Sequence, residues 1–347
     1  MSKKKKKNTW LKVVAGIVVL LVLAALCPAY YFLKTSMLTK EETQYVYVDR
    51  DDNIDSVYVK LDSITKPHAM KGFRFVAEHK DLASSLKRGR YAVDTSTSAW
   101  DFFNTLKRGE QAPLNVPIPS ARTMDKLAVA VSKKLELDSL DLLRALTDSM
   151  VCARYGFTRQ TIPAMFIPDS YNMYWTVSVD EFLERMKKEF DNYWNDERKA
   201  KAKALGLSPV EVSTLASIVT EETRATAEKP TVAGLYLNRL KKGMLLQSDP
   251  TVKFAMQDFG VRRILNRMLT IDNPYNTYKY AGLPPGPIRI PLKEDLEAVL
   301  NPEKHDYIYM CAKEDFSGTH NYARTEAEHS ANAAKYHKAL NERGIKK

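Results

Sequence analysis

Hydrophobic and polar residues recur with two different periods along this chain, which predicts a mixed α+β protein. The clearest helical pattern covers residues 208–222. Ser208, Pro209 and Glu211 together form the signature of a capped helix start, because the serine caps, the proline fits the first turn and the glutamate closes the capping box. Apolar side chains then follow at helical spacing, at Val212, Leu215, Ile218 and Val219.

One carboxylate of this predicted helix lies on its apolar face. At 100° per residue Glu222 lies near the middle of the apolar stripe, whereas Glu221 and Thr220 lie off it. A carboxylate on a buried face must find a partner or keep its proton, and a raised pKa is what a general acid needs near neutral pH. Two interpretations remain open: Glu222 is a catalytic acid, or it forms a structural ion pair with an arginine such as Arg239.

The remaining pattern predicts further elements on both sides of this helix. Short strands are expected at 45–48 and 89–93, with a break at Pro67 between them. Further helices are expected at 54–64, 98–109, 123–147, 178 to beyond 203, 230–241, and from about 325 to the C-terminus. Strands and helices between 45 and 113 suggest a small α+β module, and residues 167–171 are expected to form a loop.

The N-terminus combines a basic run with a long apolar segment. Residues 1–12 hold six lysines and no acid, residues 13–33 carry no charged side chain, and residues 34–44 suggest a polar spacer. A run of 21 residues spans a hydrocarbon core of about 30 Å, and the lysines place the N-terminus in the cytoplasm. Two alternatives are a cleaved signal peptide and a lipoprotein signal that ends at Cys27. The apolar run is long for a signal peptide, and the bulky Leu26 before the cysteine disfavours a lipoprotein signal.

Composition adds mainly exclusions. The net charge of the 347 residues is +11, but six of these charges lie in the first twelve residues, and no basic patch with interleaved aromatics follows, so a nucleic-acid partner is not expected. No Cys/His cluster has the spacing of a zinc site, and neither a metal nor another cofactor is expected. Cys152 and Cys311 could pair in an oxidising compartment, and their spacing does not decide it.

Five ordered blocks resemble the MltG/YceG family of membrane-anchored endolytic murein transglycosylases. The blocks are LASIVTEET (215–223), VAGLYLNRL (232–240), GMLLQSDPT (243–251), PYNTY (274–278) and GLPPGPI (282–288). FIPDSY (166–171) and GTH (318–320) also fit. The resemblance implies a LysM-like subdomain at 45–113 and a YceG-like catalytic domain at 114–347, outside the cytoplasmic membrane of a bacterium. It also implies a partnership with peptidoglycan synthases.

The resemblance further implies cleavage of the bond between N-acetylmuramic acid and N-acetylglucosamine in peptidoglycan glycan strands. The C6 hydroxyl of the muramic acid, not water, would attack C1 and leave a 1,6-anhydro end. Such cleavage inside a strand would limit the length of the glycan strands. Glu222 aligns with the catalytic glutamate because it precedes the threonine of the block. Thr220 stands where many relatives carry another glutamate. His320-Asn-Tyr322 is out of register with the family pattern, and no role is assigned to His320.

Seven further residues are candidates for binding the glycan. They are Asn238, Arg239, Gln247, Asp249, Tyr275, Asn276 and Tyr278. Each has a structural alternative: the amides could satisfy loop backbone groups, the arginine could pair with a carboxylate, and Asp249 before Pro250 is a common turn pair. Two other functions also remain open, a hydrolase that uses Glu222 and Asp249, and a glycan-binding scaffold without catalysis built on residues 45–113.

Overall fold

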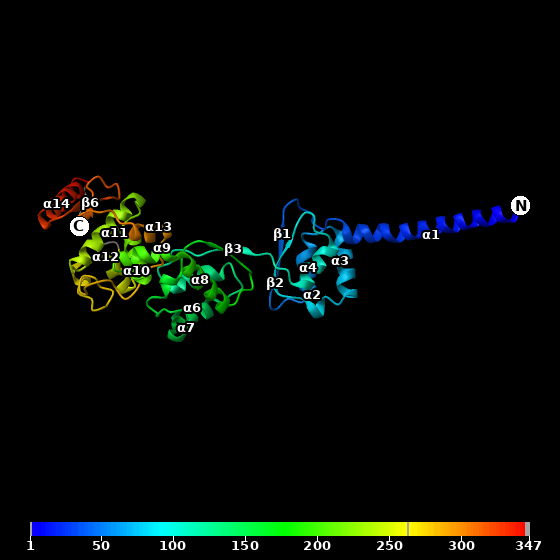
Figure 1. The fold of residues 1–347 in the computed structure, drawn as a ribbon, viewed down its shortest axis with the longest axis horizontal. Helices are drawn as coiled ribbons and strands as arrows, with labels where there is room; N and C mark the ends of the chain where they lie inside the picture. The colour runs from blue at the N-terminus through cyan, green and yellow to red at the C-terminus, as the bar shows by residue number, and fades with distance from the viewer. Residues whose placement is uncertain (1, 262–263, 344–347) are drawn as a thin grey trace. The chain divides into compact units, whose positions relative to one another are not determined.

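The computed structural model describes residues 2–261 and 264–343, whose elements divide between two compact units (Figure 1). Unit 1 comprises Met1–Asn115 and Asn172–Val177, and unit 2 comprises Val116–Tyr171 and Ser178–Lys347. Helices and short two-stranded sheets occur together, so the predicted α+β class is confirmed.

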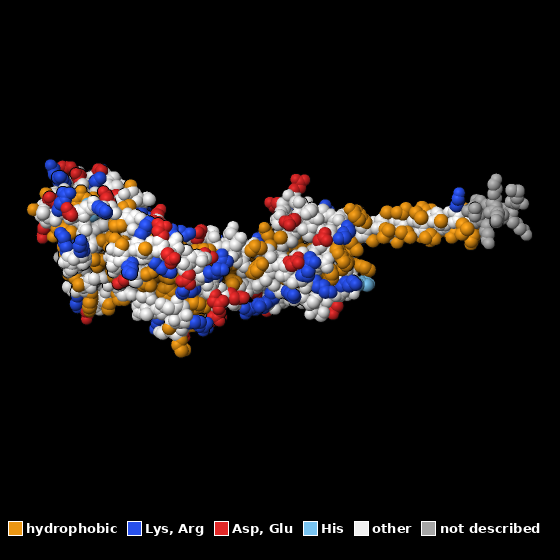
Figure 2. All heavy atoms as spheres, viewed as in Figure 1, with side chains coloured by type: hydrophobic (Ala, Val, Ile, Leu, Met, Phe, Trp, Pro, Cys, Tyr) orange, Lys and Arg blue, Asp and Glu red, His pale blue; other side chains and the backbone are white. Residues whose placement is uncertain are grey.

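Helix α1 (Ser2–Lys34) contains the predicted apolar segment. Its stretch Trp10–Lys34 has a mean hydropathy of 2.6 and is long and apolar enough to cross a membrane, and Figure 2 shows hydrophobic side chains along it. The last turn of α1 packs on α3 (Pro67–His79), where the rings of Tyr31 and His68 stack with centroids 4.2 Å apart. Gly72 lies so close to the carbonyl of Phe32 that a Cβ would collide with it. The apolar helix is therefore docked directly on the rest of unit 1.

The rest of unit 1 is a small α+β module. Strand β1 (Gln44–Val48) pairs antiparallel with β2 (Gly89–Val93), and α2 (Ile54–Asp62), α3 and α4 (Ala99–Arg108) surround a core that includes Phe73 and Phe102. The predicted strands and the capped helix α4 are confirmed. The break after the helix from Ile54 is also present, because α2 ends at Asp62 and Pro67 opens a second helix, α3, which was not expected. Met37, in the expected spacer, is fully buried in the core.

Unit 2 begins with short helices. These are α5 (Met124–Ser132), α6 (Ser139–Thr147) and α7 (Ser149–Arg154), followed by a 3₁₀ turn (Ile162–Met165). In sequence they lie between strands β3 (Leu114–Pro117) and β4 (Ser170–Met173), which form a two-stranded sheet. The expectation of one helix over 123–147 is wrong, because Asp138 caps a new helix by accepting from two backbone N–H groups. The helix from 178 also divides, into α8 (Val179–Tyr193) and α9 (Asp196–Ala204), because Asn195 caps the second part. Tyr171 lies in β4, not in a loop.

Helix α10 (Pro209–Glu222) is the central element of unit 2. It contacts α9, α11 (Lys229–Lys241), α12 (Asp249–Met256) and α13 (Lys293–Leu300), and its predicted capping box is present. Every residue from 212 to 219 is buried, so the helix has no solvent-facing side there. Its buried hydroxyls, as in Ser213 and Thr214, donate to carbonyls one turn earlier, which satisfies them without a partner outside the helix.

The C-terminal part of unit 2 is a hairpin covered by a helix. Strands β5 (Tyr309–Ala312) and β6 (His320–Ala323) pair antiparallel, and α14 (Glu326–Glu342) packs against both. Thr325 caps α14, which confirms the helix predicted there. Short 3₁₀ turns lie at Thr226–Glu228, before α11, and at Asn266–Met268.

Candidate active site

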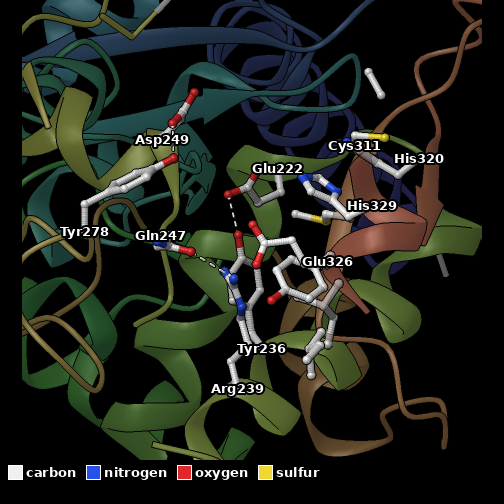
Figure 3. Close-up of a pocket in the computed structure, with 15 residues that line it drawn as sticks. Glu222, Tyr236, Arg239, Gln247, Asp249, Tyr278, Cys311, His320, Glu326 and His329 are labelled. Carbon is white, nitrogen blue, oxygen red and sulfur yellow. Dashed lines mark hydrogen bonds between the residues drawn. The ribbon is translucent and has the colours of Figure 1, made fainter. Parts of the chain in front are cut away.

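A cavity of about 470 Å³ lies in unit 2 where α10 ends (Figure 3). Its wall comes from α10, α11, the segment that enters α12, the β5–β6 hairpin and the first turn of α14. The lining residues are Glu222, Leu235, Tyr236, Arg239, Gln247, Asp249, Tyr278, Ile308, Tyr309, Met310, Cys311, Ala312, His320, Glu326 and His329. Most of these side chains are polar, as a sugar-binding site requires.

Glu222, the last residue of α10, projects into this cavity. Its Oε1 accepts hydrogen bonds from the Tyr236 hydroxyl at 2.7 Å and from the Ser248 hydroxyl at 2.5 Å. Burial raises the pKa of Glu222 and the negative charge of Asp249 adds to this, while the two hydrogen bonds and the nearby His320 oppose it. The net effect is a carboxyl group that holds its proton at a higher pH than an exposed glutamate.

The alternative that Glu222 pairs with Arg239 is wrong. The Arg239 guanidinium donates to the carbonyl of Leu246 at 2.6 Å and to the Gln247 side chain at 2.9 Å. Within residues 2–261 and 264–343, no ion pair joins Arg239 to a carboxylate. Arg239 is only 7% exposed, so its role is to hold the loop that carries Gln247 against α11 at the cavity wall.

Glu221 has the arginine partners instead. Its carboxylate binds Arg122 at 2.6 Å and Arg289 at 2.7 Å, and Arg289 also donates to the backbone of Ser120. Burial alone would raise the pKa of Glu221, but the hydrogen bond from Arg122 and the charges of both arginines outweigh it and lower the pKa. The two neighbouring glutamates therefore have opposite electrostatic environments, with the ion-paired one turned away from the cavity lining.

Four of the seven predicted binding residues line the cavity. These are Arg239, Gln247, Asp249 and Tyr278, and the last two are joined by a 2.6 Å hydrogen bond from the tyrosine hydroxyl to the aspartate. Gln247 has a left-handed backbone (φ +54°), which turns the chain so that α12 starts with Asp249 beside Glu222.

The other three lie outside the lining. Asn238 donates to the carbonyls of His305 and Tyr307, and Asn276, which is fully buried, donates to the carbonyls of Leu269 and Ile271. The Tyr275 ring packs on Phe254 with centroids 4.7 Å apart, and burial raises the pKa of its hydroxyl to about 12. Asn238 thus ties the loop before β5 to α11, and Asn276 closes the loop that contains it.

Several lining residues were not identified from the sequence. Tyr236 lies in the helix predicted over 230–241, but nothing in the pattern shows that its hydroxyl reaches Glu222. Ser248 lies in a block that carried the resemblance, where only its neighbours were selected. His329 and Glu326 enter through the capped first turn of α14, a contact between distant parts of the chain. A polar residue at an inward helical position is the one signal that could have found Tyr236.

The described part of the chain contains no group of side chains suited to bind a metal ion. Within residues 2–261 and 264–343, no group of three His, Cys, Asp or Glu side chains could hold a metal ion. Cys152 and Cys311 are free thiols, the first buried and the second in the cavity wall. The groups that the cavity offers to a ligand are the protonatable carboxyl of Glu222, the carboxyl groups of Asp249 and Glu326, two histidines and several tyrosine rings.

Comparison with known proteins agrees with this arrangement. The model of the YceG-like family matches residues 46–335. The chain is 37% identical over 166 residues to an endolytic murein transglycosylase of Bacillus subtilis, covering 48% of this chain and 45% of that protein. It is 28% identical over 298 residues to the endolytic murein transglycosylase of Streptococcus pneumoniae strain D39, covering 76% of this chain and 53% of that protein. The chain thus spans about half the length of the curated relatives it matches.

A solved structure is similar as well. The crystal structure of a YceG-like protein from Listeria monocytogenes matches 84% of this chain and 99% of its own, with a TM-score of 0.56 and 25% identity. The family match covers most of the chain and includes the helix that carries Glu222, the cavity wall and most of α14. On these grounds the chain belongs to the YceG-like family.

Proposed function

We propose that this protein is an endolytic murein transglycosylase that cleaves glycan strands of peptidoglycan and leaves 1,6-anhydromuramic acid ends. Relatives in Bacillus subtilis and Streptococcus pneumoniae are named for endolytic murein transglycosylase activity. The observation that carries the proposal is Glu222, whose pKa burial raises and whose carboxyl faces a cavity lined with polar side chains. A group of this kind is suited to protonate a departing glycosidic oxygen.

The two hydrogen bonds to Glu222 support this role. Tyr236 and Ser248 both donate to Oε1, so they fix the carboxyl in one orientation and leave Oε2 without a partner among residues 2–261 and 264–343. A proton on Oε2 would then point toward bound glycan. When the glycosidic oxygen leaves with this proton, the same two donors stabilise the carboxylate that forms, which lowers the barrier.

A hydrolase that uses two carboxylates is the second candidate, because Asp249 lines the same cavity. Attack by water requires a second carboxylate that is free to act as base or nucleophile. Asp249 accepts a 2.6 Å hydrogen bond from Tyr278, which holds it in place and favours an electrostatic role. The transglycosylase proposal therefore needs only one acid in the position of Glu222.

The remaining parts of the proposal concern location. We place α1 across the bacterial cytoplasmic membrane with the lysine-rich residues 1–12 in the cytoplasm, residues 13–33 as the span, and both units outside. Residues 45–113 would be a LysM-like glycan-binding subdomain and 114–347 the catalytic domain. We further propose that the enzyme acts on newly made strands, beside the peptidoglycan synthases that make them.

Digestion of purified glycan by the full chain in detergent tests the proposal. Mass spectrometry of the products should show 1,6-anhydro ends with the wild type and none above background with Glu222→Gln. Reducing ends would establish the hydrolase instead. Products of equal yield from Glu222→Gln would exclude both enzymes, and a wild type that binds glycan without cleaving it would favour the scaffold.

A further inference from the structure

His320, to which the sequence assigns no role, lies in the wall of the Glu222 cavity (Figure 3). It begins strand β6, opposite Ala312 of β5. Its backbone N–H donates to Oε1 of Glu228 at 2.8 Å, and its ring Nδ1 lies 3.1 Å from Oε2 of the same carboxylate. A single glutamate thus holds both the backbone and the ring of His320, which fixes the orientation of the imidazole.

Glu228 is itself held in place. It ends the 3₁₀ turn before α11, and the Thr223 hydroxyl donates to its Oε2 at 3.2 Å. Both side chains are shielded, with 15% of His320 and 12% of Glu228 exposed. The carboxylate only accepts hydrogen bonds, so Nδ1 carries a hydrogen, and whenever the ring is neutral Nε2 carries the lone pair. Within the described ranges 2–261 and 264–343, no protein group bonds to Nε2.

A carboxylate, an oriented imidazole and a free ring nitrogen are the parts of a general base. We propose that His320 takes the proton of the muramic acid C6 hydroxyl in the ring closure, with Glu228 as its positioning residue. The assignment rests on the transglycosylase function proposed above. It gives the C6 hydroxyl a base other than Glu222, whose carboxylate can take that proton only after the leaving oxygen has received its own.

The step balances in atoms and charge. The bond from C1 to the glycosidic oxygen breaks, its electron pair leaves with that oxygen, and the oxygen takes the proton of Glu222. A lone pair of the C6 oxygen forms the new bond to C1, and the hydroxyl proton passes to Nε2 of His320. The imidazolium, stabilised by Glu228, then loses its proton to solvent while Glu222 regains one, so the enzyme returns to its starting state without a cofactor.

The test uses the full chain in detergent with purified glycan strands, and compares the wild type with His320→Gln, Glu228→Gln and the double variant. The exposed His337 of α14 gives a matched control, His337→Gln, outside the cavity. We expect His320→Gln to lower kcat for anhydro ends by about 10²–10⁴-fold with KM changed by less than about twofold. Glu228→Gln should lower kcat less, and the double variant should be no slower than His320→Gln, because the carboxylate acts through the ring.

Rescue separates catalysis from folding. Added imidazole should restore part of the activity of His320→Ala, which a purely structural histidine would not allow, and melting temperatures of all variants report their folding. Activity of His320→Gln within about threefold of wild type, or losses that multiply in the double variant, would overturn the assignment. A wild type that forms no anhydro ends overturns the proposed function itself, whereas anhydro ends formed equally by His320→Gln overturn only the role of His320.

Discussion

The two adjacent glutamates at the end of α10 provide the sharpest prediction, because they have the same chemistry and opposite surroundings. Glu222→Gln and Glu221→Gln each replace one carboxylate by an amide of nearly the same shape. We expect the first to abolish activity and leave the fold intact, and the second to weaken the fold and leave the chemistry of the folded fraction intact.

The expected magnitudes follow from the contacts of each residue. An amide at 222 keeps an acceptor for Tyr236 and Ser248 but cannot donate a proton to a leaving group, so the rate should fall by about 10²–10⁴-fold, or about 3–5 kcal/mol in the barrier. Since burial disfavours the charged form of Glu222, the free energy of unfolding should stay constant or rise.

At position 221 the amide leaves two arginines without their shared carboxylate. Arg289 is 18% exposed and Arg122 is 37% exposed, so the loss should lie near the lower end of the range for a buried pair, about 3 kcal/mol. For a unit of this size that corresponds to a melting temperature lower by about 6–12 °C.

Two measurements on each variant decide the outcome: the yield of muropeptide products from the folded protein, and thermal unfolding followed by circular dichroism. The reasoning is refuted if Glu221→Gln loses activity at a temperature where it is fully folded, or if Glu222→Gln lowers the melting temperature as much as Glu221→Gln does. Either result would mean that the ion pair and the acid do not have the separate roles that their contacts indicate.

Three further predictions follow from other contacts. Tyr236→Phe or Ser248→Ala removes a hydrogen bond that favours the charged form of Glu222, so the alkaline limb of the pH–rate profile should move to higher pH; a shift to lower pH would contradict the assignment. The ion pair of Glu221 lowers its pKa in the folded state, so its stabilisation is present above the ordinary value of 4.5 and is lost as the pH falls through the folded pKa; the difference in unfolding free energy between wild type and Glu221→Gln should therefore shrink from pH 7 toward pH 3. Gly72→Ala forces a Cβ against the carbonyl of Phe32 and should cost about 1–3 kcal/mol of unfolding free energy in detergent, whereas Gly16→Ala, which has open space around it, should change nothing.

Periodicity and capping signals were enough to predict the helix that carries Glu222, because those signals are local. The same signals failed where a cap inside a longer apolar pattern starts a new helix, as at Asp138 and Asn195. An Asp or Asn inside a periodic run looks like an exposed polar position until its side chain is seen to accept from the next turn. At Pro67 the break was predicted correctly, but the helix that begins there was missed, because a proline in the first turn of a helix looks the same in sequence as one in a loop.

The site was harder to predict than the fold because most of its contacts join distant segments. Asn238 and Asn276 were reasonable candidates for sugar binding, yet both donate to backbone carbonyls of loops whose course no local pattern reveals. His320 and Glu228 are 92 residues apart and meet only because the hairpin folds back over the start of α11. The position of Glu222 on its helix could be predicted because that position depends on local periodicity, whereas its partners Tyr236 and Ser248 and the contact between His320 and Glu228 depend on tertiary structure.

The surroundings of Asp249 help to explain why Glu222 could be the only acid needed to cleave the glycosidic bond. Asp249 is the first residue of α12, where the helix N-terminus stabilises a negative charge, and Tyr278 donates to it at 2.6 Å. The negative charge of Asp249 adds to the burial that raises the pKa of Glu222 and so favours the protonated form of Glu222. The same negative charge would stabilise a sugar carbon that becomes positive as the bond breaks. If His320 takes the proton of the C6 hydroxyl as proposed, neither carboxylate has to act as the base, and the C6 hydroxyl has the advantage over water of belonging to the same sugar as C1.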